Sequence, residues 1–147
     1  MAFSNASIAR GLVSDDQLFL YTTRGCFGNP SRGVSRVIGH GNLTSPVVGL
    51  SSPVIIAGRL FRCECTIHVD SLTPFGEGVI FRDLVPRLDA FSKNPQTWST
   101  RLRRSLLRLS FDDAKLIAGH LAIVARSPEE VIDPYLKWLP QKVDEGA

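Results

Sequence analysis

The sequence predicts a mainly β fold of the α+β class, a small β-barrel with a C-terminal helix. Roughly five short segments rich in β-branched and aromatic residues follow one another closely, with Gly and Pro turn signals between them. A single strong helical repeat of apolar residues comes late, over residues 111–122. The chain has 147 residues, 44% of them hydrophobic, which is enough for one domain with a buried core.

The first strand is expected at residues 17–23, QLFLYTT, where apolar side chains occupy both faces. Such a run is typical of a central strand. Residues 24–33, RGCFGNPSRG, combine three glycines with a proline and predict a loop. A second strand is expected at residues 34–44. Its centre, Gly39–His40–Gly41, predicts a bulge or a tight corner.

A β-hairpin is expected next, from two β-rich runs at residues 54–57 and 60–69. Gly58 and Arg59 separate them, which fits a type II′ turn. Residues 79–88 predict a short strand or a helical turn that breaks near Pro86. Residues 98–109 fit a helix and a strand equally well.

The helix at residues 111–122 has a start signal of its own. Ser110 and Asp113 resemble a capping box in which Asp replaces the usual Glu. We assign residues 1–126 to the domain and 127–147 to a C-terminal tail. That tail either packs through Tyr135, Leu136 and Trp138 or is loose.

Several classes of protein are disfavoured by composition. No run of 18 apolar residues occurs, so we expect no membrane-spanning helix. The N-terminus lacks the charged and apolar regions of a secretory signal. Three cysteines are too few and odd in number for a disulfide scaffold. A cytoplasmic location with no membrane partner is therefore the expectation.

The distribution of charge favours a polyanionic partner. The chain carries a net charge of +3, but residues 1–109 hold 13 basic and 7 acidic residues, whereas residues 110–147 hold 4 and 7. Arginine outnumbers lysine 13 to 4, and arginine is the better residue for bidentate phosphate contacts. Codon bias in a GC-rich genome gives the same excess, so nucleic acid is indicated only weakly.

Metal and catalytic motifs are poorly supported. Cys63 and Cys65 would share one strand face while His68 points away, so we expect two core cysteines rather than metal ligands. The sequence has no G-x-S-x-G elbow, no H-E-x-x-H and no phosphate-binding glycine motif. We therefore expect no catalytic residue, no metal and no cofactor.

Two basic segments are candidate nucleic-acid contacts. The loop after the first strand carries Arg24, Phe27, Asn29 and Arg32, which could stack on a base, read its edge and hold a phosphate. A structured turn with a buried phenylalanine is an equal alternative. The densest basic cluster is Arg101, Arg103, Arg104 and Arg108. It could follow a phosphate backbone, or it could be a solvated face, with Trp98 before it as core residue or pocket wall.

The order of these segments resembles the EVE domain family. The matching features are LYTT at residues 20–23, RVIGHGNLTSP at 36–46 and LRLSFDD at 107–113, ahead of the last helix. The resemblance covers residues 17–124. It implies a PUA-like β-barrel related to the YTH readers of modified RNA, with a pocket that receives one flipped, possibly modified, nucleobase of RNA or DNA.

The resemblance places Tyr21, Thr22 and Thr23 at the family's polar positions after the strand. The residue types of the two basic segments add further expected members of this site. They are Arg24, Phe27, Asn29 and Trp98 in the pocket and Arg32, Arg101, Arg103 and Arg104 as phosphate contacts. An EVE domain opens with a further apolar strand and loop, of which Phe3 and Ser4 resemble the remainder. The missing strand leads us to expect a longer natural protein, a homodimer or a folded-back N-terminus.

The expected function is therefore a non-catalytic nucleic-acid-binding module with a pocket for a single base. A protein-interaction module and a small enzyme acting on nucleotides or RNA through the same pocket are the alternatives.

Overall fold

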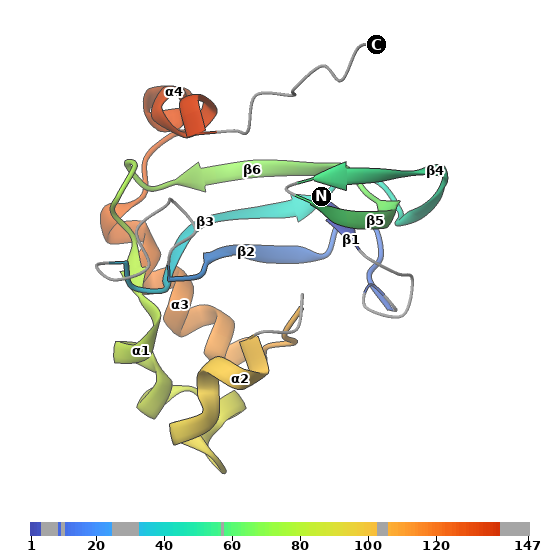
Figure 1. The fold of residues 1–147 in the computed structure, drawn as a ribbon. Helices are drawn as coiled ribbons and strands as arrows, with labels where there is room; N and C mark the ends of the chain where they lie inside the picture. Colours follow the sequence, from blue (N-terminus) through green and yellow to red (C-terminus); the bar gives the residue numbers. More distant parts are fainter. Residues whose placement is uncertain (4–8, 10, 25–32, 57, 103–105, 139–147) are drawn as a thin grey trace.

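The computed structural model describes residues 1–3, 9, 11–24, 33–56, 58–102 and 106–138. These residues form a mixed α+β structure in which two antiparallel sheets lie beside a group of helices (Figure 1). The strands are β1 (Ala2–Phe3), β2 (Gln17–Thr22), β3 (Arg36–Leu43), β4 (Val48–Ile56), β5 (Arg59–Glu64), β6 (Ile67–Leu72) and β7 (Val79–Ile80). The coarse prediction of an α+β fold is confirmed, but the expectation of a mainly β fold is wrong, because helices and strands are about equally extensive.

The larger sheet has the order β2-β3-β6, and β7 pairs with the remaining part of β3. The expected bulge is present, because the register of β3 against β6 shifts between His40 and Gly41. A Cβ atom on Gly41 would collide with the backbone oxygen of His68, so only glycine fits this close approach of two strands.

The strand β2 lies at one end of this sheet and pairs, among the described strands, with β3 alone. The prediction that residues 17–23 form a strand is confirmed, but the prediction that it is central is wrong. Leu18, Phe19, Leu20 and Tyr21 are each half-buried, so both faces are partly covered although one edge has no described strand beside it. The apolar pattern indicates burial of the faces and carries no information about edges.

The smaller sheet has the order β1-β5-β4 and contains the expected hairpin. Ile56 pairs with Arg59, so the turn lies between these two residues, one residue earlier than expected. Gly58 has a φ of +74° at the second turn position. A type II′ turn needs its positive φ at the first position, so that assignment is corrected.

The two sheets meet where one long antiparallel ribbon bends. Thr44 follows β3 and Thr66 precedes β6, and their hydroxyl groups lie 2.8 Å apart. The backbone N–H of Thr44 also donates to the carbonyl of Thr66 at 2.9 Å. No described strand joins the outer edge of β2 to the smaller sheet. The sheets therefore do not close, and the expected closed barrel is corrected to two open sheets.

Helices lie beside the larger sheet on more than one side (Figure 1). They are α1 (Phe81–Leu84), α2 (Trp98–Leu102), α3 (Phe111–Val124) and α4 (Pro128–Trp138), with 3-10 turns at Val85–Arg87, Asp89–Phe91 and Pro95–Thr97. The helix predicted after Ser110 is confirmed, and the Ser110 hydroxyl accepts a hydrogen bond from the Asp113 N–H at 3.2 Å. The ambiguous segment at 98–109 begins as a helix and continues without regular structure at 106–109.

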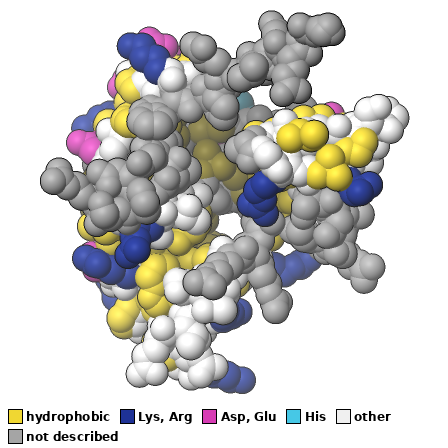
Figure 2. Space-filling view, in the orientation of Figure 1, with side chains coloured by type: hydrophobic (Ala, Val, Ile, Leu, Met, Phe, Trp, Pro, Cys, Tyr) yellow, Lys and Arg dark blue, Asp and Glu magenta, His cyan; other side chains and the backbone are white. Residues whose placement is uncertain are grey.

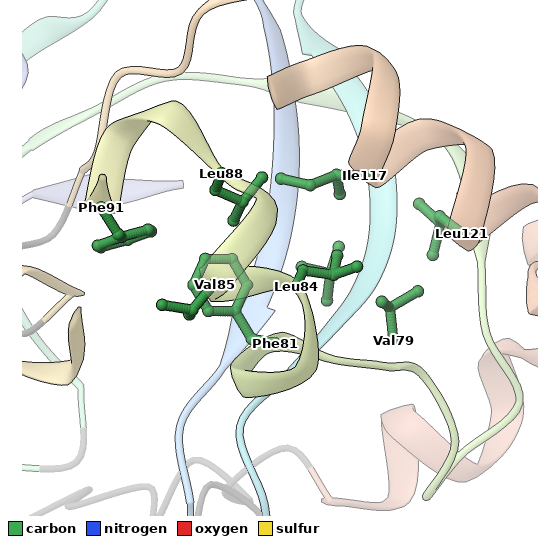
Figure 3. Packing of buried hydrophobic residues seen from close by; sticks show 9 residues of the cluster. Val79, Phe81, Leu84, Val85, Leu88, Phe91, Ile117 and Leu121 are labelled. Atoms are coloured by element: carbon green, nitrogen blue, oxygen red, sulfur yellow. The ribbon is translucent and has the colours of Figure 1, made fainter. Parts of the chain in front are cut away.

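Two apolar clusters form the core. The first joins Val37 on β3 to β7, α1 and α3, and it contains Val79, Phe81, Leu84, Val85, Leu88, Phe91, Ile117 and Leu121 (Figure 3). The second contains Phe3, Ala9, Leu43, Cys63 and Cys65. The prediction that both cysteines are core residues is confirmed, since they are 6% and 4% exposed.

The segment after residue 127 contains a helix, α4, that contacts β6. The Tyr135 hydroxyl donates to the carbonyl of Thr73 at 2.7 Å, and its ring meets Phe75 edge-on at 5.2 Å. Of the expected packing residues, Tyr135 packs, Leu136 is 53% exposed and does not, and the Trp138 side chain lies outside the described residues. Within the described ranges, every helix is too short or too polar to cross a membrane.

Candidate functional site

A cavity runs along β2. It has a volume of about 660 Å³ and lies between β2 on one side and α3 and residues 106–109 on the other. Its walls are mostly aliphatic and aromatic, with Leu18, Phe19, Leu20, Tyr21, Phe81, Leu106, Leu107, Leu109, Ala114 and Ile117 among them. Cavities of this size and character are typical of sites for small ligands.

The polar groups of this cavity come from the residues that precede and face β2. Asp16 and Gln17 line it at the start of the strand, and Arg108 lines it from the facing segment. One carboxylate oxygen of Asp16 accepts a hydrogen bond from the Val13 N–H at 2.9 Å. The arrangement therefore offers a carboxylate, an amide and a guanidinium near an apolar interior.

Among the predicted pocket residues that the structure describes, Tyr21 is the one that lines this cavity. Its ring meets Phe81 edge-on with the centroids 5.4 Å apart. Burial raises the pKa of the Tyr21 hydroxyl, and a hydrogen bond with the Ser35 side chain opposes the rise in part. The hydroxyl is therefore uncharged at neutral pH and able to donate.

Trp98 lies on Phe81 as well, with the ring centroids 5.7 Å apart. It packs against the first core cluster and does not line the cavity, so Phe81 stands between the two predicted residues Tyr21 and Trp98. The structure thus brings them to one aromatic cluster but not to one pocket.

The other described pocket residues lie elsewhere. Phe3 is 2% exposed inside the second core cluster and does not reach the cavity. Thr22 is buried, and its hydroxyl bonds to the carbonyl of Arg36 at 3.3 Å. Thr23 and Arg24 are exposed beyond the end of β2. The predicted residues Ser4, Phe27, Asn29, Arg32, Arg103 and Arg104 lie outside the described residues.

Arg101, a predicted phosphate contact, already has partners within the fold. Its guanidinium carbon lies 5.3 Å from the centre of the Phe91 ring, and Nη1 donates to the carbonyl of Ala90. It also lines a second cavity, of about 420 Å³, together with Asp89, Lys93 and Asn94. The cation therefore contributes to packing before any ligand is considered.

A polar cluster on the larger sheet was not predicted from the sequence. Asp70 lies between two histidines, with one oxygen 3.5 Å from Nδ1 of His40 and the other 3.3 Å from Nε2 of His68. Nε2 of His40 also lies 3.3 Å from the amide oxygen of Gln17. Alternation along the strands explains this cluster. Asn42 pairs with His68, and His40 and Asp70 each lie two residues from a member of that pair, so all of them share one face of the sheet.

The cysteine and histidine residues considered as metal ligands do not converge. Burial raises the pKa of the Cys65 thiol, which disfavours the thiolate that a metal requires. His68 is exposed and engaged with Asp70 instead. In the part of the chain that the structure describes, no three groups of the ligating types are close enough to hold an ion.

Comparison with known proteins gives no match to this chain, whether among family models, curated proteins or solved structures.

Proposed function

We propose that this chain is a non-catalytic nucleic-acid-binding module that receives a single nucleobase in the cavity along β2. The observation that carries the proposal is the combination of Phe19, Tyr21 and Phe81 in the cavity wall with Asp16 and Gln17 at one end. Aromatic rings stack on the faces of bases, while carboxylate and amide groups hydrogen-bond to their edges.

The resemblance of LYTT, RVIGHGNLTSP and LRLSFDD to the EVE domain family supports the same proposal, because that family implies a base pocket. On this proposal the chain is a PUA-like domain whose sheets are open beside β2. The base could belong to RNA or DNA and could be modified. The excess of basic residues in positions 1–109 favours the polyanionic partner.

The proposal is tested by titrating the protein with short single-stranded RNA and DNA, unmodified and carrying modified bases, and following binding by calorimetry. Replacing Tyr21 by Leu should weaken binding about tenfold or more, since stacking contributes on the order of 1–3 kcal/mol per base. Tyr21→Phe should keep most of the affinity. Phe111→Leu is the matched control, because Phe111 is 82% exposed and does not line the cavity.

The phosphate contacts are tested separately by salt. The double variant Arg103→Ala/Arg104→Ala should weaken binding equally for all sequences and flatten its salt dependence, since phosphate contacts carry no sequence information. Absence of binding to every oligonucleotide, or a Tyr21→Leu variant that binds like the unchanged protein, would contradict the proposal.

A protein-interaction module is the second candidate, and one observation favours it. The hairpin of β4 and β5 exposes a group of large apolar side chains, and no described part of the molecule covers them. Exposed apolar patches of this kind often mark protein interfaces.

A further inference from the structure

The hairpin of β4 and β5 is apolar on both of its faces. Ile55 pairs with Leu60 across the hairpin, so these two side chains share one face, and they are 70% and 41% exposed. Val54 and Ile56 occupy the other face and are 42% and 44% exposed. Figure 2 shows hydrophobic side chains gathered at the right of this view, where β4 and β5 lie in Figure 1, with basic side chains beside them. Both faces therefore leave large apolar side chains in contact with water, and burying them would be favourable.

The backbone of this hairpin also has an open edge. The strand β4 is the outer strand of the order β1-β5-β4, and no described strand pairs with its other side. Pro53 cannot donate a backbone hydrogen bond, but it lies just before the segment Val54–Ile56. Each residue of that segment has an N–H group, so the segment itself can pair with another strand. A lipid interior would leave such an edge unsatisfied, so a strand of protein is the better partner.

The strand β2 has the complementary properties. Its outer edge has no described neighbour, and the apolar cavity of about 660 Å³ follows it. The larger sheet therefore has a hollow beside an open edge, while the smaller sheet has exposed apolar side chains beside another. The exposed apolar side chains of the hairpin could therefore fill the hollow beside β2.

Charge selects one orientation between these two edges. Arg59 and Arg62 on the hairpin are exposed and have no ion-pair partner among the described residues. Asp15 and Asp16 precede β2 and are likewise without an ion pair in the described ranges. If β4 lay antiparallel to β2, Ile56 and the turn would come to the start of β2, which places Arg59 beside this acidic pair. A parallel alignment would separate the charges.

We propose that the β4–β5 hairpin of one copy of this chain docks along β2 of a second copy. Residues Val54–Ile56 then add an antiparallel strand to the open edge of β2, and the side chain of Ile55, on one face of this strand, enters the cavity. Arg59 of the hairpin pairs with Asp15 and Asp16 of the other copy. Two copies that exchange hairpins reciprocally form a closed dimer.

The docked hairpin and a nucleobase would occupy the same cavity, so self-association and base binding exclude one another. The inference does not depend on the proposed function, because self-association is measured with the protein alone. A protein that dimerises but does not bind nucleic acid would support the hairpin docking and contradict the proposed function.

The test is sedimentation of the full chain over a wide range of concentration. The unchanged protein should show a reversible monomer–dimer equilibrium, and Ile55→Glu should weaken association at least about tenfold, since it removes a large apolar contact and introduces a charge. Ile123→Glu is the matched control, because Ile123 is 75% exposed on α3 and does not line the cavity. A monomer at all concentrations, or a dimer that Ile55→Glu leaves intact, would overturn the proposal.

Charge reversal tests the orientation. Arg59→Glu should weaken the dimer, and adding Asp15→Lys and Asp16→Lys in the same chain should restore a substantial part of the lost association. The effect should decrease at high salt, where exposed charges are screened. Failure of the combined variant to regain any association would overturn the antiparallel docking, because the proposed ion pairs would then not exist.

Discussion

The buried carboxylate of Asp113 accepts a hydrogen bond from the backbone N–H of Asp89 at 2.7 Å. Its second oxygen accepts from the N–H of Ala90 at 2.9 Å. Asp113 stands in the first turn of α3 and is 2% exposed, so its side chain connects this helix to the 3-10 turn Asp89–Phe91. This link holds the 3-10 turn that carries Phe91 against the helix that carries Ile117, so two parts of the first core cluster are fixed relative to one another.

Replacing Asp113 by Ala should lower the free energy of unfolding by about 3 kcal/mol, because two partly buried hydrogen bonds to a carboxylate are lost and the side chain leaves the core. Urea denaturation monitored by circular dichroism measures the change. Asp112→Ala is the matched control, since Asp112 stands in the same helical turn and is exposed. We expect the control to differ from the unchanged protein by less than about 1 kcal/mol; equal losses in both variants would show that the helix dipole alone explains Asp113.

Replacing glycine by alanine should have opposite effects on stability at Gly41 and at Gly119. A Cβ atom at residue 41 would meet the backbone of His68, which cannot move without disturbing the pairing of β3 and β6, so Gly41→Ala should destabilise by at least about 2 kcal/mol. A Cβ atom at Gly119 in α3 would meet nothing within 4 Å. Gly119→Ala should therefore stabilise by about 0.5–1 kcal/mol. Thermal unfolding of the two variants side by side checks both signs.

The local elements were predictable because short-range patterns decide them. The period of apolar residues after Ser110 indicated α3, and the two β-rich runs around Gly58 indicated the hairpin. The capping-box pattern was informative only in part. Ser110 caps the helix as expected, whereas the Asp113 side chain turns to Asp89, 24 residues earlier in the chain. No local pattern contains that partner.

The candidate site was far less predictable. Tyr21 was expected from the resemblance to the EVE domain family, but Phe19, Asp16 and Gln17 were not expected, although they stand within five residues of it. Which of these side chains reach the cavity depends on how α3 and residues 106–109 face β2, a long-range relation. The run Val54–Ile56 could have indicated an exposed surface, since three successive apolar residues next to a tight turn cannot all be covered by one sheet face.

The alkaline stability of the protein should depend on Tyr135. Burial raises the pKa of its hydroxyl above the ordinary value of 10.0, with the hydrogen bond to Thr73 acting in the opposite direction. A raised pKa means that the folded state favours the protonated form. The resulting stabilisation is complete below the ordinary pKa and is lost as the pH rises through the raised one.

Tyr135→Phe should remove part of this alkaline loss and should also lower the free energy of unfolding near neutral pH by about 1 kcal/mol, through loss of the hydrogen bond to Thr73. Denaturation curves for both proteins from about pH 8 to about pH 11 make the comparison. If the free energy of unfolding of the two proteins differs by the same amount at every pH, the Tyr135 hydroxyl has the same pKa in the folded and the unfolded state. Burial also raises the pKa of the Tyr21 hydroxyl and of the Cys65 thiol, so both contribute to the alkaline loss that the variant retains.

Filling the cavity along β2 tests its existence and its role together. Ala114 lines it from α3, so the larger side chain of Ala114→Leu should enter empty space rather than clash. We expect the variant to be as stable as the unchanged protein or up to about 1 kcal/mol more stable, because it buries additional apolar surface without opening a void. A loss of more than about 1 kcal/mol would show that the site is already packed.

The same Ala114→Leu variant should lose both affinities that are assigned to the cavity. Oligonucleotide binding should weaken about tenfold or more, and so should self-association, because a base and the Val54–Ile56 segment both need the volume that the leucine takes. Calorimetry and sedimentation measure the two losses on one folded protein. Ile123→Leu, on the exposed face of the same helix, is the control that should leave both unchanged. A variant that keeps either affinity would show that the corresponding ligand binds away from β2.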